Sequence, residues 1–397
     1  MFNIKKTVKK SFCIGCGFCE ALDNQGDIKM HLEPNGFYEP QLTGHIPSET
    51  LRQLGKICPG INIECIDHRH SFCGKLVSSY EGWANDPVIR KQGSSGGIIT
   101  AIALYLLNTK QVTAILQVGP SKNNVLQNVL RISRNELEIK TCTSSRYAPA
   151  LMFNRLPYYL SQKNETYLFI GKPCDIMAIK KYIKIHPEHD NRIKYYISLI
   201  CAGMPSYNAT LKLIKEAQNT STPTDVKYRG DGWPGNFRVK FEDGYTYTRT
   251  YNDSWGHVLG RNIHFRCKIC PDGIGQWADI AVGDAWQTQD GYPDFSERDG
   301  KSFILSRTSN GEMLLNKAFK NGAITLNKCD INNFKSIQPY QYLRLRSIFY
   351  RLLPAWFLSG CRLRIKHLHI PPFNFLQGCK ISIGTIYRYY KKRNITL

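Results

Sequence analysis

The sequence of 397 residues lacks any long hydrophobic run. Its longest apolar stretch, "IITAIALYLL" at 98–107, is too short to cross a bilayer as a helix. The opening "MFNIKKTVKK" leads into a cysteine-rich motif without an apolar signal region. We therefore expect a cytoplasmic protein, in which the fourteen cysteines stay reduced and serve as metal ligands or catalytic groups rather than as disulfides.

Acidic residues are absent from the end of the chain. Between Gln341 and Leu397 there are eleven Lys or Arg and no Asp or Glu, so half of the formal net charge of +22 lies there. A helical extension packed on the body, with a solvated basic face, explains this charge. It can equally dock on an anionic membrane surface, an acidic redox partner such as a small ferredoxin, or nucleic acid. The packed extension is the first interpretation. Among the docking surfaces, the interleaved aromatic and aliphatic residues favour peripheral contact with the inner face of a membrane, and we expect no nucleic acid.

Cysteine is plentiful near the start of the chain. In "CIGCGFC", Cys13, Cys16 and Cys19 follow at intervals of three, and Cys58 directly precedes a proline. Bacterial ferredoxins read C-x2-C-x2-C-x3-C-P, and the fourth cysteine of each run binds the cluster started by the other run. Here the fourth position of the first run is Asp23 instead of cysteine. Of the second run only Cys58 is kept, the cysteine that would bind the cluster of the first run. The pattern favours one 4Fe–4S cluster, with zinc or inert thiols as the alternatives.

Four later cysteines suggest a second site. Cys174 opens an expected helix directly after a strand, where the helix dipole would lower the pKa of its thiol. Cys201 follows a neighbouring apolar strand, and if the two strands are parallel both cysteines lie at one edge of the sheet. Cys267 and Cys270 form a C-x2-C pair in "RCKICPDG". These four residues could form one site, although a zinc half-site with two unrelated thiols has the same spacing.

Between the cysteine-rich start and the basic end, strand and helix patterns alternate without an internal repeat or a low-complexity linker. A glycine-rich turn feeds a helix in "GSSGGIITAIALYLLN", and "TYLFIGKPCDIMAIKKYIK" reads as strand, turn and helix. "IKYYISLICAGMPS" reads as another strand and turn, with a helix after Pro205. "FRVKF" and "YTYTRT" around "EDG" read as a hairpin. The sequence predicts a mixed α/β fold, with a domain boundary near residues 70–80.

Seven separated motifs together resemble the beta-subunit family of coenzyme F-420 hydrogenases and dehydrogenases, which includes chlorophyll-pathway reductases such as 7-hydroxymethyl chlorophyll a reductase. They are "CIGCGFC", "GSSGG" with "ITAIALYLL", "SSRYAPA", "FIGKPCDIMAIKKY", "LICAGMPS", "KYRGDGWPGNF" and "RCKICPDGIGQWADIAVGDAW". The resemblance implies a ferredoxin-like 4Fe–4S domain over 1–72, an α/β domain with FAD and iron–sulfur chemistry over 73–335, and a basic extension over 336–397. It also places cysteines of the family at the second site, which implies a second cluster.

The resemblance implies that the loop from Gly93 to Gly97 binds the flavin cofactor. Backbone N–H groups and hydroxyls at a helix start suit an anionic pyrophosphate, although glycine-rich turns before helices are common. The expected FAD contacts are Ser94, Ser95, Gly96, Gly97, Thr100 and Arg146. Arg146 stands where many relatives have lysine and is expected to neutralise a phosphate or the reduced flavin, whereas Asp284 would either cap a turn or touch the cofactor. No catalytic residue is identified.

These inferences predict an iron–sulfur flavoprotein that passes electrons between 4Fe–4S clusters and FAD, to or from a two-electron acceptor such as coenzyme F-420. Expected partners are a ferredoxin or a hydrogenase or dehydrogenase subunit. Because the ligands of only one of the two ferredoxin clusters are kept, a single external donor is expected. The alternatives are a ferredoxin-dependent reductase of an organic intermediate, for example in surface-glycan biosynthesis, a non-catalytic electron-transfer subunit, and a zinc-bearing nucleic-acid binder.

Overall fold

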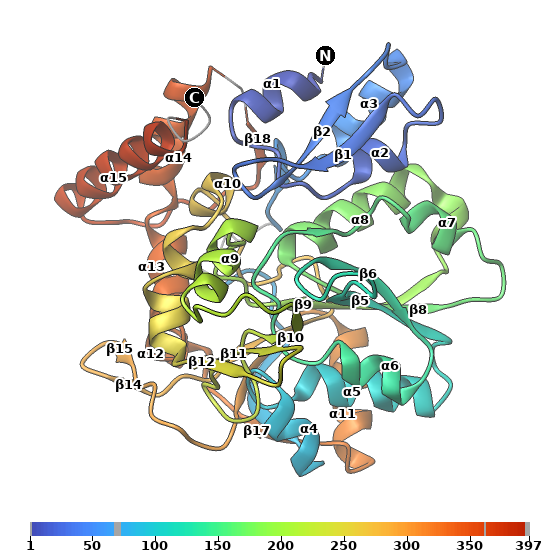
Figure 1. Ribbon diagram of the computed structural model, residues 1–397, viewed down its shortest axis with the longest axis vertical. Coiled ribbons are helices and arrows are strands. Elements are labelled where there is room, and N and C mark those ends of the chain that lie inside the picture. Colours follow the sequence, from blue (N-terminus) through green and yellow to red (C-terminus); the bar gives the residue numbers. More distant parts are fainter. Residues whose placement is uncertain (1, 67–72, 361–362, 394–397) are drawn as a thin grey trace.

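The computed structural model describes residues 2–66, 73–360 and 363–393 (Figure 1). A large mixed sheet occupies its lower half, a smaller N-terminal region lies above it, and the last helices run along one side. Part of the expected domain boundary, residues 67–72, lies outside the described residues.

The central sheet of the described chain has nine strands in the order β17-β4-β16-β13-β9-β8-β5-β6-β7. Strands β5, β8, β9 and β13 are parallel neighbours, whereas β16, β4 and β17 add antiparallel strands beyond β13. On the other side, β6 is antiparallel to β5 and parallel to β7. The bounds are β4 (Ser78–Ala84), β5 (Ala114–Pro120), β6 (Asn128–Ser133), β7 (Ala150–Leu151), β8 (Tyr167–Gly171), β9 (Ile193–Leu199), β13 (Ile280–Asp284), β16 (Ser302–Ser306) and β17 (Ile324–Lys328).

Helices cover both faces of this sheet, which explains why β8 is apolar and buried along its whole length. Successive residues of a strand point to opposite faces, so Phe169 packs with Ile176 on one face and Leu168 with Ile102 on the other. The first face carries α7 (Leu156–Leu160) and α8 (Pro173–Ile185). The second carries α4 (Pro87–Gln92), α5 (Ile98–Asn108), α6 (Glu136–Thr141) and α11 (Ser309–Lys320).

The N-terminal region packs on α8 rather than standing apart. Phe18 stacks on Phe153 with ring centroids 4.0 Å apart and on Tyr182 at 5.3 Å. Leu54 and Ile57 join the same buried cluster. The region contains an antiparallel hairpin, β1 with β2, and its elements are α1 (Ile4–Lys9), α2 (Phe18–Ala21), β1 (Ile28–Leu32), β2 (Tyr38–Leu42), α3 (Ser48–Ile57) and β3 (Asn62–Glu64).

A smaller antiparallel sheet, β10-β11-β12, lies beside the central one and has a core around Phe237 and Leu213. Its elements and the short pieces near it are α9 (Tyr207–Lys215), β10 (Pro223–Lys227), β11 (Phe237–Phe241), β12 (Thr246–Arg249), the π-helical turn η2 (Asn252–Gly256), η3 (Leu259–Arg261), α10 (Phe265–Lys268), β14 (Thr288–Gln289) and β15 (Tyr292–Pro293). The 3-10 turns η1 (Pro187–His189) and η4 (Ile331–Asn333) complete the connections.

The basic C-terminal segment folds back onto the N-terminal region. Its elements are α12 (Phe334–Ile337), α13 (Pro339–Arg346), α14 (Ile348–Ser359), β18 (Arg364–Lys366) and α15 (Phe375–Arg393). Strand β18 pairs in parallel with β3, and Phe12, Phe265 and Tyr389 share one buried cluster. In the described ranges, none of the helices combines the length and the apolar character needed to span a bilayer.

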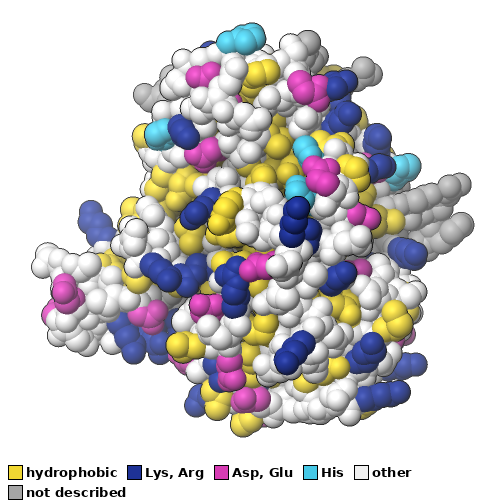
Figure 2. Space-filling view, turned by 90° about the vertical axis from the view of Figure 1, so that its right-hand side faces the viewer, with side chains coloured by type: hydrophobic (Ala, Val, Ile, Leu, Met, Phe, Trp, Pro, Cys, Tyr) yellow, Lys and Arg dark blue, Asp and Glu magenta, His cyan; other side chains and the backbone are white. Residues whose placement is uncertain are grey.

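The predicted mixed α/β alternation is confirmed. The glycine-rich turn feeds α5, the two strand-turn-helix segments become β8 with α8 and β9 with α9, and the expected hairpin is β11 with β12. The face at the right of Figure 1, over α3, α6 and α7, is shown in Figure 2. Basic, acidic and apolar side chains are interspersed there instead of being gathered by kind.

Candidate functional site

The first group of cysteines, called here the N-terminal cysteine set, consists of Cys13, Cys16, Cys19 and Cys58. The first two lie in the loop between α1 and α2, the third lies on α2, and the fourth follows the last residue of α3. The thiols of Cys13, Cys16 and Cys19 each interact electrostatically with that of Cys58. Burial raises the pKa of Cys13 to about 12 and the pKa values of Cys16 and Cys19 well above their ordinary value. The fold therefore brings all four predicted thiols together.

Glycine allows the loop to wrap around this set. Gly15 and Gly17 have φ angles of +64° and +90°, a backbone conformation that residues with a side chain rarely adopt. A Cβ atom at Gly15 would also lie 2.6 Å from the carbonyl oxygen of Tyr38. The glycines between the cysteines thus let successive thiols turn toward one centre.

The second group, called here the sheet-edge cysteine set, consists of Cys174, Cys201, Cys267 and Cys270. Cys174 is the second residue of α8 after β8, and Cys201 comes two residues after β9. Strands β8 and β9 are parallel, so the prediction that both cysteines lie at the carboxyl edge is confirmed. Cys267 lies on α10 and Cys270 in the loop after it. All four side chains line one small cavity, together with Lys172 of β8's exit loop and Arg344 of α13.

The electrostatics of the sheet-edge set correct one expectation. Burial and the neighbouring Asp175 raise the pKa of Cys174 well above its usual value, and Lys172 offsets this only in part. The prediction that the helix start lowers this pKa is therefore wrong, because the thiol is enclosed by protein. Burial likewise raises the pKa of Cys201 to about 12, although the guanidinium of Arg344 acts in the opposite direction.

The two cysteine sets are neighbours. Ile14, which lies between two members of the N-terminal set, lines the cavity of the sheet-edge set. Buried Arg266, next to Cys267, donates through Nε to the Gly60 carbonyl at 2.9 Å and through its guanidinium to the Pro59 carbonyl at 3.0 Å. The loop that follows Cys58 is thereby tied to the helix that carries Cys267.

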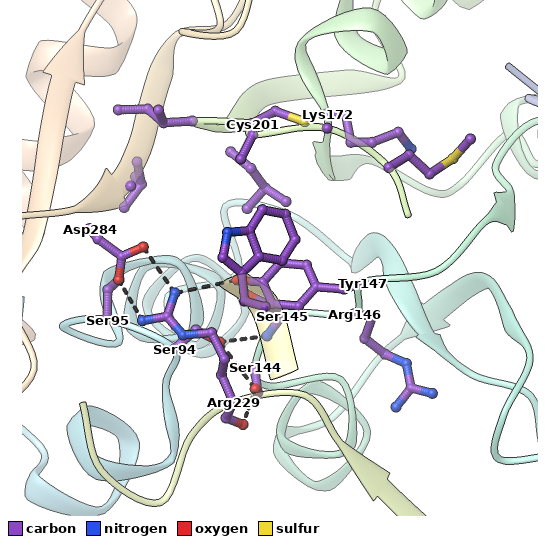
Figure 3. Close-up of a pocket in the computed structure, with 18 of the residues that line it drawn as sticks. Ser94, Ser95, Ser144, Ser145, Arg146, Tyr147, Lys172, Cys201, Arg229 and Asp284 are labelled. Atoms are coloured by element: carbon purple, nitrogen blue, oxygen red, sulfur yellow. Dashed lines mark hydrogen bonds and ion pairs between the residues drawn. The ribbon is translucent and has the colours of Figure 1, made fainter. Parts of the chain in front are cut away.

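A much larger cavity, of about 590 Å³, opens beside the sheet-edge set. Its floor is formed at the carboxyl ends of β5, β8, β9 and β13, the usual ligand position in open α/β sheets. Figure 3 shows Cys201 and Lys172 on one side of it and serines 94, 95, 144 and 145 on another. Cys201 and Lys172 line this cavity and the small one alike.

The start of α5 faces the large cavity. Ser94, Ser95, Gly97 and Thr100, four of the expected FAD contacts, line it. The Ser94 hydroxyl oxygen accepts from the N–H of Ser145 at 2.6 Å and lies 3.1 Å from the hydroxyl oxygen of Ser144. N–H groups of the first turn have no partner within a helix, so this edge offers donors to an anionic ligand.

Two of the expected contacts differ from the expectation: Gly96 lies outside the cavity wall, and Arg146 lines the cavity but turns its guanidinium away. Gly96 does not line the cavity, because its N–H donates to the Ser302 hydroxyl at 2.9 Å and a Cβ atom there would lie 2.5 Å from the Gly82 carbonyl oxygen. The Arg146 guanidinium points away from the cavity in Figure 3. It donates to the carbonyl oxygens of Val226 and Val125 at 3.1 and 2.7 Å. Position 96 therefore requires glycine because two backbone segments pack closely there. Arg146 instead connects the segments that contain Val125 and Val226.

A buried ion pair that the sequence did not assign lies in the same wall. Arg229, only 1% exposed, donates two hydrogen bonds to Asp284, at 2.9 and 2.7 Å. Although burial opposes the charge, the Asp284 carboxylate raises the pKa of Arg229 well above its ordinary value. Trp233 Nε1 also donates to Asp284, at 2.8 Å, and the Arg229 guanidinium lies over the ring of Tyr251 at 4.6 Å. The pair joins residues 55 positions apart, which spacing alone cannot reveal.

Replacing Asp284 with Ala is expected to lower the free energy of unfolding by about 3–5 kcal/mol, because it leaves a buried guanidinium without its anion. Chemical denaturation of purified protein measures this. The matched control is Asp299→Ala, which removes a side chain that is 89% exposed and 3.6 Å from Arg90. That change is expected to cost less than about 1 kcal/mol. Equal losses in the two variants would mean that the Arg229 pair is not a structural anchor.

One end of the large cavity carries positive charge. Arg261 and Lys268 line it there. Burial, followed by the neighbouring Arg388, lowers the pKa of Lys268 to about 8. Several cations therefore crowd this end, which suits an anionic ligand group.

Family comparisons agree with this architecture. Residues 79–156 match the family model described as coenzyme F420 hydrogenase/dehydrogenase, beta subunit N-term, and residues 164–331 match the companion model for the C terminus of the same subunit. The F420-dependent formate dehydrogenase 1 subunit beta of Methanococcus maripaludis is 27% identical over 61% of this chain and 59% of its own length. The coenzyme F420 hydrogenase subunit beta of Methanothermobacter thermautotrophicus is 24% identical over 60% of this chain and 80% of its own.

A solved structure shares the fold. The F420-reducing [NiFe] hydrogenase complex from Methanosarcina barkeri, in a xenon derivative, contains a chain that superposes with a TM-score of 0.51 at 18% identity, covering 81% of this chain and 92% of that one. The matches to the formate dehydrogenase subunits span 59% and 60% of the length of those relatives. Taken with the two family models, these likenesses show that the chain belongs to the coenzyme F420 hydrogenase/dehydrogenase beta-subunit family.

Proposed function

We propose that this chain is an oxidoreductase in which the N-terminal and sheet-edge cysteine sets each hold a 4Fe–4S cluster and the large cavity holds FAD. The observation that carries the proposal is the position of Cys201, which lines both the sheet-edge cavity and the large cavity. Ile14 of the N-terminal loop lines the same small cavity. The sheet-edge cysteine set therefore adjoins the N-terminal cysteine set on one side and the large cavity on the other.

The arrangement of donors favours clusters over single ions. In the part of the chain that the structure describes, no three Cys, His, Asp or Glu side chains converge closely enough to hold one metal ion. A zinc ion needs its sulfur ligands about 2.3 Å from one point. A cubane cluster instead takes each thiolate on a different iron, so its four sulfur ligands stay further apart. Both cysteine sets therefore fit the larger group better.

The large cavity fits a flavin dinucleotide. Its volume of about 590 Å³ lies within the usual range for cofactor sites. The α5 start and the serine hydroxyls offer donors to a pyrophosphate. In the cavity wall, the buried hydroxyl oxygen of Thr143 has no hydrogen-bond partner in the described chain. When bound, the clusters would supply single electrons and the flavin would exchange them for pairs.

The protein residues have separable tasks in this proposal. Thr100 and the N–H groups at the start of α5 would bind the anionic part of FAD, and the positive end at Arg261 and Lys268 would draw in an anionic substrate. Tyr251 and Trp286 form an aromatic wall that excludes water. The proposed acceptor is coenzyme F420, because the relatives named above are F420-dependent enzymes or their subunits. The same relatives support a hydrogenase or dehydrogenase subunit as the electron-transfer partner.

Anaerobic mixing of the isolated, chemically reduced chain with oxidised coenzyme F420 tests the proposal. Loss of the visible absorbance of F420 is expected, by one F420 for each pair of electrons that the reduced chain holds. If the chain oxidises without reducing F420 or any other two-electron acceptor, it is a non-catalytic electron-transfer subunit. If it reduces only an organic intermediate supplied with reduced ferredoxin, the reductase alternative holds.

Thr100→Glu is expected to weaken FAD binding by about tenfold or more, because a carboxylate in the first turn of α5 repels a bound pyrophosphate. The helix itself tolerates the change, since negative charge near its start is favourable. Flavin per protein after purification is the measurement, and Thr100→Gln is the control of equal size. Full FAD content in Thr100→Glu would place the pyrophosphate elsewhere.

A further inference from the structure

The last helix of the chain, α15, exposes large apolar side chains to solvent. Leu376 is 71% exposed, Ile383 66% and Tyr387 63%. Ile386 and Tyr390 are exposed as well. Most globular helices turn such residues toward the core, so this face is unusual for a helix that covers a folded domain.

The spacing gathers these residues on one face. Leu376, Ile383, Tyr387 and Tyr390 recur at intervals of seven, four and three, which is the period of an α-helix. The opposite face is already used, because Gly378 lies against the ring of Tyr350 and the Ser382 hydroxyl donates to the Tyr350 carbonyl at 2.7 Å. The helix thus has one face packed on α14 and an apolar face that is open to solvent.

The last turn of α14, which lies beside α15, also exposes large apolar side chains. The Tyr389 hydroxyl lies 3.5 Å from the carbonyl oxygen of Leu358, so the ends of α14 and α15 run side by side. Phe357 on α14 is 81% exposed, and Trp356 beside it is also exposed. Figure 1 shows both helices at the outer margin of the molecule.

Cations flank the apolar face. Lys380 and Lys391 are exposed on α15, at positions adjoining its apolar stripe. The chain from Gln341 to Leu397 contains no acidic residue to balance them. Elsewhere the surface differs, since on the face in Figure 2 basic and acidic side chains are interspersed.

We propose that the exposed face of α15, with Trp356 and Phe357 of α14, lies on an anionic lipid surface. Apolar and aromatic side chains beside lysine are typical of helices that lie in the membrane interface. A protein interface is the other occupant to consider, but lysine is depleted from the centre of such interfaces. The two contributions act together, because apolar burial anchors the helix and the basic side chains select anionic headgroups.

Vesicle flotation tests this inference with the full-length protein. Vesicles of phosphatidylcholine with about one third phosphatidylglycerol are expected to carry the protein, whereas pure phosphatidylcholine vesicles bind it at least about tenfold more weakly. Raising the salt concentration should weaken binding to the anionic vesicles. Equal binding to both kinds of vesicle, or to neither, overturns the proposal.

Variants locate the contact. Ile383→Glu with Tyr387→Glu is expected to reduce binding by at least about tenfold, and Lys380→Gln by about fivefold. Leu137→Glu is the matched control, because Leu137 is 74% exposed on α6, and it should bind as the unchanged protein does. Circular dichroism confirms that each variant is folded. If the double variant still binds vesicles fully, or if it instead abolishes concentration-dependent self-association seen by sedimentation, the lipid assignment is wrong.

Discussion

Replacing Cys174 with Ala is expected to lower the iron content from about eight to about four per FAD, because one of two cubane clusters loses a ligand. Reduction of FAD by an external one-electron donor should slow sharply in the same variant, because the sheet-edge cysteine set lies between the N-terminal cysteine set and the large cavity. Iron analysis and stopped-flow reduction measure the two effects.

The control for this variant is Cys329→Ala, which removes a thiol outside both cysteine sets. Its iron content and its rate of FAD reduction should equal those of the unchanged protein. Cys142→Ala, in the wall of the large cavity, should also keep all its iron. Full iron in Cys174→Ala, or loss of one zinc in place of iron, would contradict the second cluster.

Replacing Cys16 with Ala is expected to remove about four irons per chain and to leave FAD bound. The backbone of this loop should persist, because the Cys16 carbonyl accepts hydrogen bonds from the N–H groups of Met152 and Phe153 at 3.1 and 2.9 Å, and alanine keeps that carbonyl. The N-terminal region also shares its core with α8, which does not depend on the thiol.

A double variant separates this effect from the first. Cys16→Ala with Cys174→Ala should retain almost no iron, while each single variant retains about half. If Cys16→Ala alone loses all the iron, the two sets do not load independently. If it loses none, the N-terminal cysteine set is not a cluster site.

The sequence predicts the fold correctly where short connections join segments with a clear hydrophobic pattern. Only Lys172 separates the end of β8 from the start of α8, and an entirely buried strand before an amphipathic helix predicts their order. The packing of the C-terminal segment on the N-terminal region was not readable. The pairing of β18 with β3 joins residues about 300 positions apart, and no local pattern indicates that contact.

The sequence predicts which residue types form the candidate site, but it does not predict the directions in which their side chains point. Cysteine spacing predicted the N-terminal cysteine set, because several thiols at close intervals have few other uses. The sheet-edge cysteine set is spread over three separate segments, so it was inferred from the expected strand ends and from the family resemblance. Arg146 and Arg229 both stand in motifs rich in polar residues, so the sequence does not indicate which of them faces the large cavity. In the structure Arg229 forms an ion pair in the cavity wall, whereas the Arg146 guanidinium points away (Figure 3). The charge pattern places Arg344 in a basic tail, whereas its side chain is buried beside the sheet-edge cysteine set.

The central claim is that both cysteine sets hold 4Fe–4S clusters beside one flavin. The most direct measurement is iron, sulfide, zinc and FAD content in unmodified protein purified without oxygen. The account predicts about eight irons and about eight sulfides per FAD, without zinc. About four irons and one zinc per FAD would contradict it, because the sheet-edge cysteine set would then hold a structural ion.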